Sequence, residues 1–196
     1  MNRKLILFSL LALFVVAVGI IAFSQAYPAA LVDWRPVSLD SFNRESAAAM
    51  HYYKKAVEVY GSGSLPVETE DFKNEIRRAV LDKLVEDKIV EAALAERLEK
   101  KDIKNLVEKK IAEISVSAGE GIEEKVMTIY GISMADFKKE ILEPQARMEI
   151  LESRFLLESD PDSDFNNWLD SLKANSKVSV LIPGFSWKDN KVALSE

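Results

Sequence analysis

The sequence contains no cysteine, a single histidine, and few glycine and proline residues. Without cysteine, the chain has no disulfide, no thiolate metal ligand and no thiol nucleophile. The single histidine, His51, has no second histidine and no serine–aspartate pair beside it, so we interpret it as a structural residue. Seven glycines and six prolines in 196 residues, with 48% apolar and 30% charged side chains, favour a helical globular protein over a disordered or all-β chain.

The chain also has no excess of positive charge. It contains 26 basic and 32 acidic residues, and its net charge is −6. Such a surface repels phosphate backbones, so we expect no nucleic-acid partner. The adjacent carboxylates Glu123 and Glu124 belong to a first helical turn, where they favour the helix dipole, and they do not predict an acid–base pair. The alternating Asp160, Asp162 and Asp164 lack the glycine and the distal glutamate of a calcium loop and predict a helix cap. We therefore predict no catalytic, cofactor-binding or metal-binding residue.

One long apolar run is present near the start of the chain. Leu5–Phe23 is 19 residues without a charge, which is enough for a helix to span a bilayer, and we interpret it as a retained anchor. The alternative is a signal peptide cleaved after Ser24–Gln25–Ala26, which would make the protein secreted. The basic Arg3 and Lys4 precede the run, so the N-terminus is expected in the cytoplasm and the rest outside, at the cell surface or in the periplasm.

Residues 1–28 are thus predicted to form the anchor, or signal peptide, with a short linker, and residues 29–196 to form one domain. In that domain, apolar residues recur at helical spacing between glycine-rich breaks. The most regular helical spacing of apolar residues follows Gly131. Gly131 ends one helix, and Ser133 caps the next. Pro144 lies inside the helix that begins after Ser133 and predicts a kink in it, because proline removes a hydrogen bond to the carbonyl of Glu140.

Only Lys177–Ile182 has a good strand pattern. Because a lone strand leaves its backbone groups unpaired, we expect it to pair with Ala30–Trp34, near the start of the domain. Phe185 and Trp187, in the tail, are expected to pack back on the domain. The predicted fold class is therefore mainly α, with an N-terminal transmembrane helix, a multi-helix domain and a small two-stranded pairing of its extended ends.

Several local strings, in this order, resemble the SurA-type N-terminal chaperone domain of extracytoplasmic peptidyl-prolyl isomerases, which include PrsA-like and trigger-factor-like relatives. The resemblance extends from about Leu31 to Ile182. The strings are Pro36-Val37-Ser38 with Phe42, Val80 to Val85, Tyr130-Gly131-Ile132-Ser133 followed by Phe137-Lys138 and Pro144, and Phe165, Trp168 and Leu169 before Lys177-Val178.

The chain departs from the family pattern at two places. Family members often carry an Asn-Gly turn in the extended segment at the start of the domain. This chain has Asp33–Trp34 there, so we expect a turn of different shape. Many members also insert a parvulin isomerase domain before the segment that corresponds to Phe165–Leu169, where this chain has only Glu158–Asp164. The resemblance therefore implies the binding function without the enzyme, and an active prolyl isomerase is the disfavoured alternative.

What the resemblance implies is a membrane-anchored, extracytoplasmic module that holds unfolded or newly exported polypeptides through apolar contacts, without a cofactor. A structural or adaptor protein that docks one membrane-associated partner is the alternative from another class. Flexible methionine and aromatic side chains suit a surface that accepts varied apolar segments, although most such residues at helical spacing belong to the core. The candidate client-binding residues are Met50, Tyr53, Met127, Tyr130, Met134, Phe137, Met148 and Phe155.

Overall fold

The structure, a computed structural model, describes residues 27–60, 67–119, 121–160 and 162–195. The predicted anchor, Leu5–Phe23, lies outside these residues. Among the residues described, no helix is long and apolar enough to cross a membrane. The described part is mainly helical with a few short antiparallel strands, as the sequence predicts.

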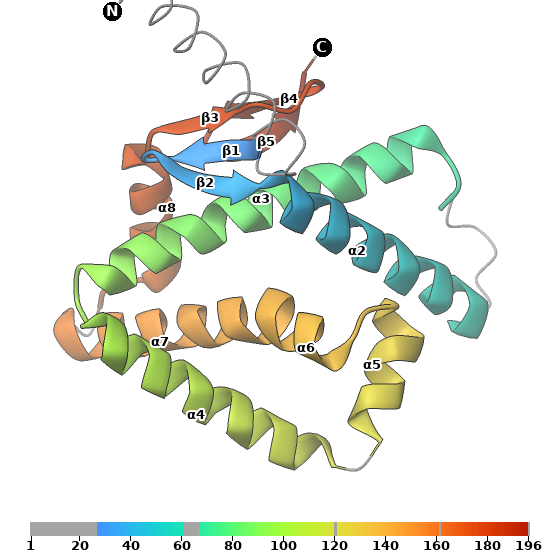
Figure 1. Ribbon diagram of the computed structural model, residues 1–196. Coiled ribbons are helices and arrows are strands. Elements are labelled where there is room, and N and C mark those ends of the chain that lie inside the picture. The colour runs from blue at the N-terminus through green and yellow to red at the C-terminus, as the bar shows by residue number, and fades with distance from the viewer. Residues whose placement is uncertain (1–26, 61–66, 120, 161, 196) are drawn as a thin grey trace, which may run out of the picture.

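The helices fan out below a small layer of strands (Figure 1). The long helix α3 diverges from α4 after their short connection, α7 lies between them, and α2 crosses α3 near the strands. The helices are α2 (Leu39–Tyr60), α3 (Glu70–Ala95), α4 (Lys100–Ala118), α5 (Ile122–Tyr130), α6 (Met134–Phe137), the π-helix η1 (Lys138–Leu142), α7 (Glu143–Glu158) and α8 (Phe165–Asn175).

Local capping explains where several of these helices begin. The Thr69 side chain accepts a hydrogen bond from the backbone N–H of Phe72, and the Ser133 side chain accepts one from Asp136. Asp164 caps α8 in the same way, which confirms the predicted cap. Helix α4 continues through Ser115 and Ser117 to Ala118, and Gly119 ends it.

The predicted pairing of the two extended ends is confirmed. Strand β1 (Pro28–Val32) pairs antiparallel with β3 (Val178–Val180), with Ala30 opposite Val180. The sheet is larger than predicted, because β2 (Arg35–Ser38) pairs with the other edge of β1 and the order is β2-β1-β3. The tail forms a further antiparallel hairpin of β4 (Phe185–Lys188) and β5 (Lys191–Leu194). We call β1 to β5, together with the residues that connect and flank them (27–38 and 177–195), the sheet layer.

Both hairpins close through two-residue turns that contain no glycine. Asp33 and Trp34 have φ of 47° and 68°, and Asp189 and Asn190 have φ of 51° and 60°. Positive φ at both central residues is the signature of a type I′ turn, for which Asn-Gly is the usual sequence. The expectation of a differently shaped entry turn was therefore wrong. A type I′ turn was hard to predict at Asp33–Trp34 because tryptophan is rare in this conformation.

Replacing Trp34 with glycine is expected to stabilise the domain. The left-handed conformation costs a non-glycine residue about 1–2 kcal/mol, and the extra freedom of glycine in the unfolded chain takes back about 0.5–1 kcal/mol. We expect a net gain of about 0.5–1 kcal/mol in the free energy of unfolding, measured by urea denaturation. Gly184→Ala is the opposite control, because Gly184 has φ of 86° with open space at its Cβ position. A loss of stability in Trp34→Gly would show that the indole packs on the fold.

Two hydrophobic cores are joined by α3. The first lies under the sheet layer and contains Phe42, Val80 and Leu81, with Phe185 and Val192 from the tail. Trp187 packs against this core, so the expectation that the tail folds back is confirmed. The second core lies where the far end of α3 meets α4, α7 and α8. It is formed by Val90, Ala93, Leu94, Val107, Ala146, Ile150, Leu151 and Leu169.

The sequence predicts a kink in the helix at Pro144, and the structure has the π-helix η1 directly before this residue. In η1 the backbone N–H of Glu143 donates to the carbonyl of Lys138, five residues earlier. Proline has no N–H, so it leaves the carbonyl of Glu140 without its helical partner. The ammonium of Lys83, on α3, donates to this carbonyl over 3.3 Å. A side chain from another helix therefore replaces the hydrogen bond that Pro144 removes.

Candidate functional site

A large hollow in the described part of the chain lies where α3, α4 and α7 meet. It has a volume of about 700 Å³. Its apolar lining consists of Leu94, Ala95, Leu98, Ile103, Val107 and Ile111. We call it the α3–α4–α7 groove.

The groove exists because α3 and α4 diverge from a connection of four residues, 96–99. The apolar stripe of α3 continues past its end to Leu98, and the stripe of α4 begins at Ile103. Near this connection, Leu94 and Val107 are buried in the second core, whereas Leu98, Ile103 and Ile111 pack against it and remain half-buried. The groove is thus an open extension of the second core.

Charged side chains of both signs surround this apolar floor. Arg147 on α7 pairs with Glu143 over 2.9 Å, and Lys104 on α4 pairs with Glu108 over 3.7 Å. Each pair joins residues four apart on one helix, so these charges already have partners within their own helices. An apolar floor with a charged rim can hold an apolar segment and keep polar groups on either side of it hydrated.

A second, smaller hollow of about 240 Å³ lies between α2, α3, α5 and η1. Its apolar lining comprises Ala48, Ala49, Tyr52, Tyr53, Val80, Tyr130, Ile132 and Ile141. We call it the tyrosine pocket. The rings of Tyr52 and Tyr130 stack with their centroids 5.5 Å apart, and Tyr130 contacts Phe137 over 5.1 Å.

His51 helps to hold α5 against α2 beside this pocket. Its ring Nε2 donates a hydrogen bond to the carbonyl oxygen of Thr128, 3.0 Å away. Its ring also lies over Gly131, where an added Cβ would come within 3.0 Å of the imidazole. Gly131 ends α5 with φ of 69°, as the sequence predicts. The half-buried His51 is therefore a structural contact between two helices, as we predicted.

A cluster of buried charges lies beneath the tyrosine pocket. The guanidinium of Arg44 pairs with the carboxylate of Glu140, which is only 4% exposed. Lys83 donates to Glu45 over 3.2 Å and to Asp87 over 2.7 Å. The second carboxylate oxygen of Glu140 has no hydrogen-bond partner in the described part of the chain.

Burial shifts the pKa values of these groups. It raises the pKa of Glu45 to about 7, although the Lys83 ammonium opposes the shift. Burial likewise raises the pKa of Glu140 and of Asp87, against the neighbouring Arg44 and Lys83. Burial alone would lower the pKa of Lys83, but the Asp87 and Glu45 carboxylates outweigh it and raise the value. The cluster therefore holds carboxyl groups that take up protons more readily than exposed ones.

The structure brings together only part of the predicted client-binding set. Tyr53 and Tyr130 line the tyrosine pocket, and the ring of Phe137 contacts that of Tyr130. Met134 is half-buried on the short helix α6, and Met127 is 53% exposed on α5.

The other members of the set belong to the two cores. Met50 packs against the first core and Met148 against the second. Phe155 is buried against Phe165 and Trp168. None of the eight residues lines the α3–α4–α7 groove. The predicted client-binding residues are all methionine or aromatic, so the prediction missed the leucine and isoleucine side chains of the groove floor. The convergence of the α3 and α4 stripes at residues 94–103 was the available signal.

Among the described residues, no group of three or more His, Cys, Asp or Glu side chains is placed to hold a metal ion. Comparison with protein-family models, with curated proteins and with solved structures finds no match for this chain. The resemblance to the SurA-type domain therefore stays a prediction.

Proposed function

We propose that this protein is a membrane-anchored, extracytoplasmic chaperone-like module that binds unfolded or newly exported polypeptides without chemistry of its own. The α3–α4–α7 groove is the observation that carries the proposal. Its volume of about 700 Å³ lies within the usual range of ligand-binding clefts, and its floor is aliphatic. A floor of leucine, isoleucine and valine recognises apolar character rather than a particular sequence, because it offers no hydrogen bonds to read one.

Helices α5 and α7 also expose large apolar side chains to solvent. They are Met127 and Ile129 on α5, and Leu156 and Leu157 on α7. Single exposed apolar residues are ordinary, but pairs of large ones on these two helices increase the apolar surface available to an extended client. The tyrosine pocket is a second place where such a client could bury a side chain.

The connection between α7 and α8 supports a binding role without catalysis. Helix α7 ends at Glu158 and α8 begins at Phe165, so residues 159–164 alone join them. Many members of the SurA-type family carry a parvulin isomerase domain at this position. The anchoring part of the proposal relies on the uncharged run Leu5–Phe23, which ends five residues before β1 begins at Pro28.

Removing apolar groups from the groove is expected to weaken client binding. In Ile103→Ser/Ile111→Ser, two half-buried isoleucines of the groove become polar. If each contributes about 1 kcal/mol of apolar contact to the client, the dissociation constant rises roughly 30-fold. The measurement is suppression of aggregation of an unfolded client by residues 27–196, which contain both cores, together with the dissociation constant for that client.

The matched control is Leu106→Ser/Val116→Ser. It makes the same kind of change twice on the same helix, at exposed positions that do not line the groove. Circular dichroism establishes that both variants remain folded. Equal loss of binding in the two variants would rule out the groove as the binding site. If the unaltered domain neither slows aggregation nor binds a client, the chaperone proposal fails; capture of one stoichiometric partner would favour the adaptor function.

A further inference from the structure

The sheet layer differs in charge from the rest of the molecule. Its segments, residues 27–38 and 177–195, contain four basic and two acidic residues, whereas residues 39–176 contain 20 basic and 29 acidic ones. Lys177, Lys188 and Lys191 are exposed, and none of them forms an ion pair in the part of the chain that the structure describes. The sheet layer is thus a basic end on an acidic protein, with free cations on its surface.

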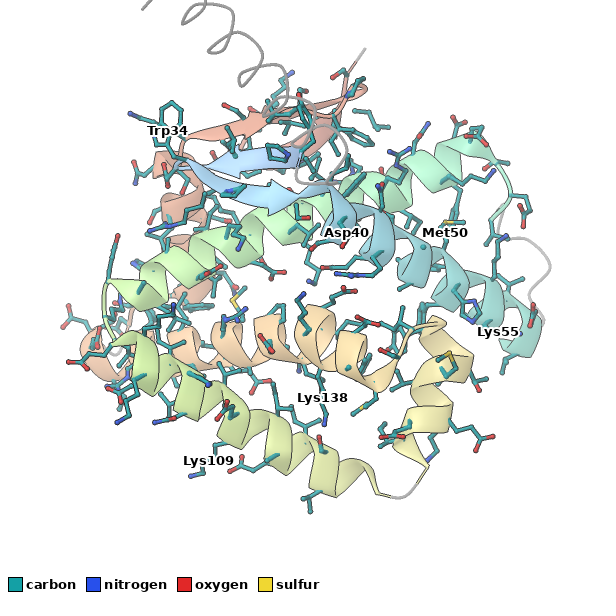
Figure 2. The ribbon with its side chains drawn as sticks, viewed as in Figure 1. Trp34, Asp40, Met50, Lys55, Lys109 and Lys138 are labelled. Carbon is teal, nitrogen blue, oxygen red and sulfur yellow. The ribbon has the colours of Figure 1, made fainter. Side chains whose placement is uncertain are left out.

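The sheet layer also exposes a tryptophan, Trp34, whose backbone has the left-handed conformation that is unfavourable for residues other than glycine. Trp34 is 87% exposed, and Figure 2 shows it projecting from the edge of the sheet layer. Among the described residues, no other aromatic ring and no cation stacks on it. Its φ of 68° would suit glycine better. The indole therefore adds nothing evident to the fold, and two further large side chains of the layer, Tyr27 and Leu194, are 52% and 47% exposed.

If the apolar run Leu5–Phe23 spans a bilayer, as proposed above, its position in the sequence brings the sheet layer close to that bilayer. Phe23, the last residue of the run, precedes Pro28, the first residue of β1, by five positions. An extended chain covers at most about 3.5 Å per residue, so β1 can begin no more than roughly 17 Å from the end of a membrane-spanning run. If the run spans a membrane, the strands therefore lie closer to the lipid than α4 does, because α4 lies at the opposite end of the described part from the strands (Figure 1).

We propose that the sheet layer docks on the surface of a bilayer that contains anionic phospholipid. Tryptophan favours the boundary between headgroups and acyl chains, so Trp34 inserts there. Lys177, Lys188 and Lys191 face lipid phosphates, to which an acidic protein would otherwise not be attracted. Docking of this end directs α4 and the α3–α4–α7 groove away from the membrane, toward passing polypeptides. The inference rests on the proposed anchor but not on client binding.

The test uses the full chain reconstituted in vesicles of phosphatidylcholine with phosphatidylglycerol, and in vesicles of phosphatidylcholine alone. In the double variant Trp168→Phe/Trp187→Phe, Trp34 is the only tryptophan. We expect brominated lipids to quench its emission strongly in the anionic vesicles and acrylamide to quench it weakly. Lys177→Gln/Lys188→Gln/Lys191→Gln, added to this variant, should reduce the lipid quenching severalfold.

A second measurement does not depend on the two core tryptophans. The chain has no cysteine, so one fluorophore can be attached at Trp34→Cys and, as the matched control, at Lys109→Cys. Lys109 lies on α4, on the opposite side of the molecule from Trp34 (Figure 2). Lipid quenchers should act on the label at position 34 and leave the label at position 109 unaffected.

Each outcome decides the proposal. Flotation with the vesicles together with equal aqueous exposure of positions 34 and 109 would overturn docking while leaving the anchor in place. Failure of the chain to float would overturn both the anchor and the docking. Equal lipid quenching with and without the three lysines would overturn the electrostatic part. Preferential, lysine-dependent quenching at position 34 would establish the docked orientation whatever the result of the client-binding assays.

Discussion

Phe42→Ala is expected to lower the free energy of unfolding by about 3–5 kcal/mol, the usual cost of deleting a fully buried aromatic side chain. Phe42 is 0% exposed at the point where α2, α3 and the tail hairpin meet. Its ring packs edge-on against Phe185 with centroids 6.4 Å apart, and the Arg77 guanidinium lies 5.2 Å from its centroid. The substitution therefore removes an aromatic contact between α2 and the C-terminal hairpin.

Urea denaturation measures this loss as a lower midpoint with an unchanged slope, provided that unfolding remains two-state. Phe137→Ala is the matched control, because Phe137 is only half-buried beside Tyr130. We expect it to cost about 1–2 kcal/mol, since it loses less apolar area and leaves a site open to water. Equal costs for the two phenylalanines would contradict the assignment of Phe42 to the centre of the first core.

The domain is expected to become less stable as the pH rises from about 5 to 8. Burial raises the pKa of Glu45 from 4.5 to about 7, so between these values the folded state binds a proton that the unfolded state has lost. Stability then falls with pH, and the contribution is complete below pH 4.5 and lost above pH 7. A shift of this size corresponds to about 3 kcal/mol as an upper bound. The raised pKa values of Glu140 and Asp87 act in the same direction.

Glu45→Gln isolates the contribution of this carboxyl. The amide stays neutral, so the variant should match the parent near pH 5 and be more stable by about 2–3 kcal/mol at pH 8, where the parent must hold a buried charge. Glu58→Gln is the control, because Glu58 is exposed and Lys55 lowers its pKa. Unfolding free energies from pH 5 to 8 provide the measurement. A parent profile that is flat or rises over this window would contradict the buried-cluster account.

The buried cluster and the groove were beyond sequence-based prediction for different reasons. Glu45 and Glu140 look like ordinary surface residues of amphipathic helices, because burial depends on the packing of η1 against α2 and α3. The sequence did predict that Pro144 interrupts the regular hydrogen bonding of its helix. It could not show that Lys83, 57 residues from Glu140 in the chain, would supply the missing hydrogen bond.

The sequence by itself determined the local features of this protein: the mainly helical class, the caps at Ser133 and Asp164, the helix end at Gly131 and the pairing of the two extended ends. Caps and helix ends depend on side chains within about four residues, and the pairing followed from the scarcity of strand partners. Only the tertiary structure decided which apolar residues are covered. Phe155 and Ile103 both belong to apolar stripes with helical spacing, yet Phe155 is buried and Ile103 lines an open groove. That difference depends on the angle at which α4 leaves α3, which is set by contacts between distant residues and has no periodic signature in the sequence.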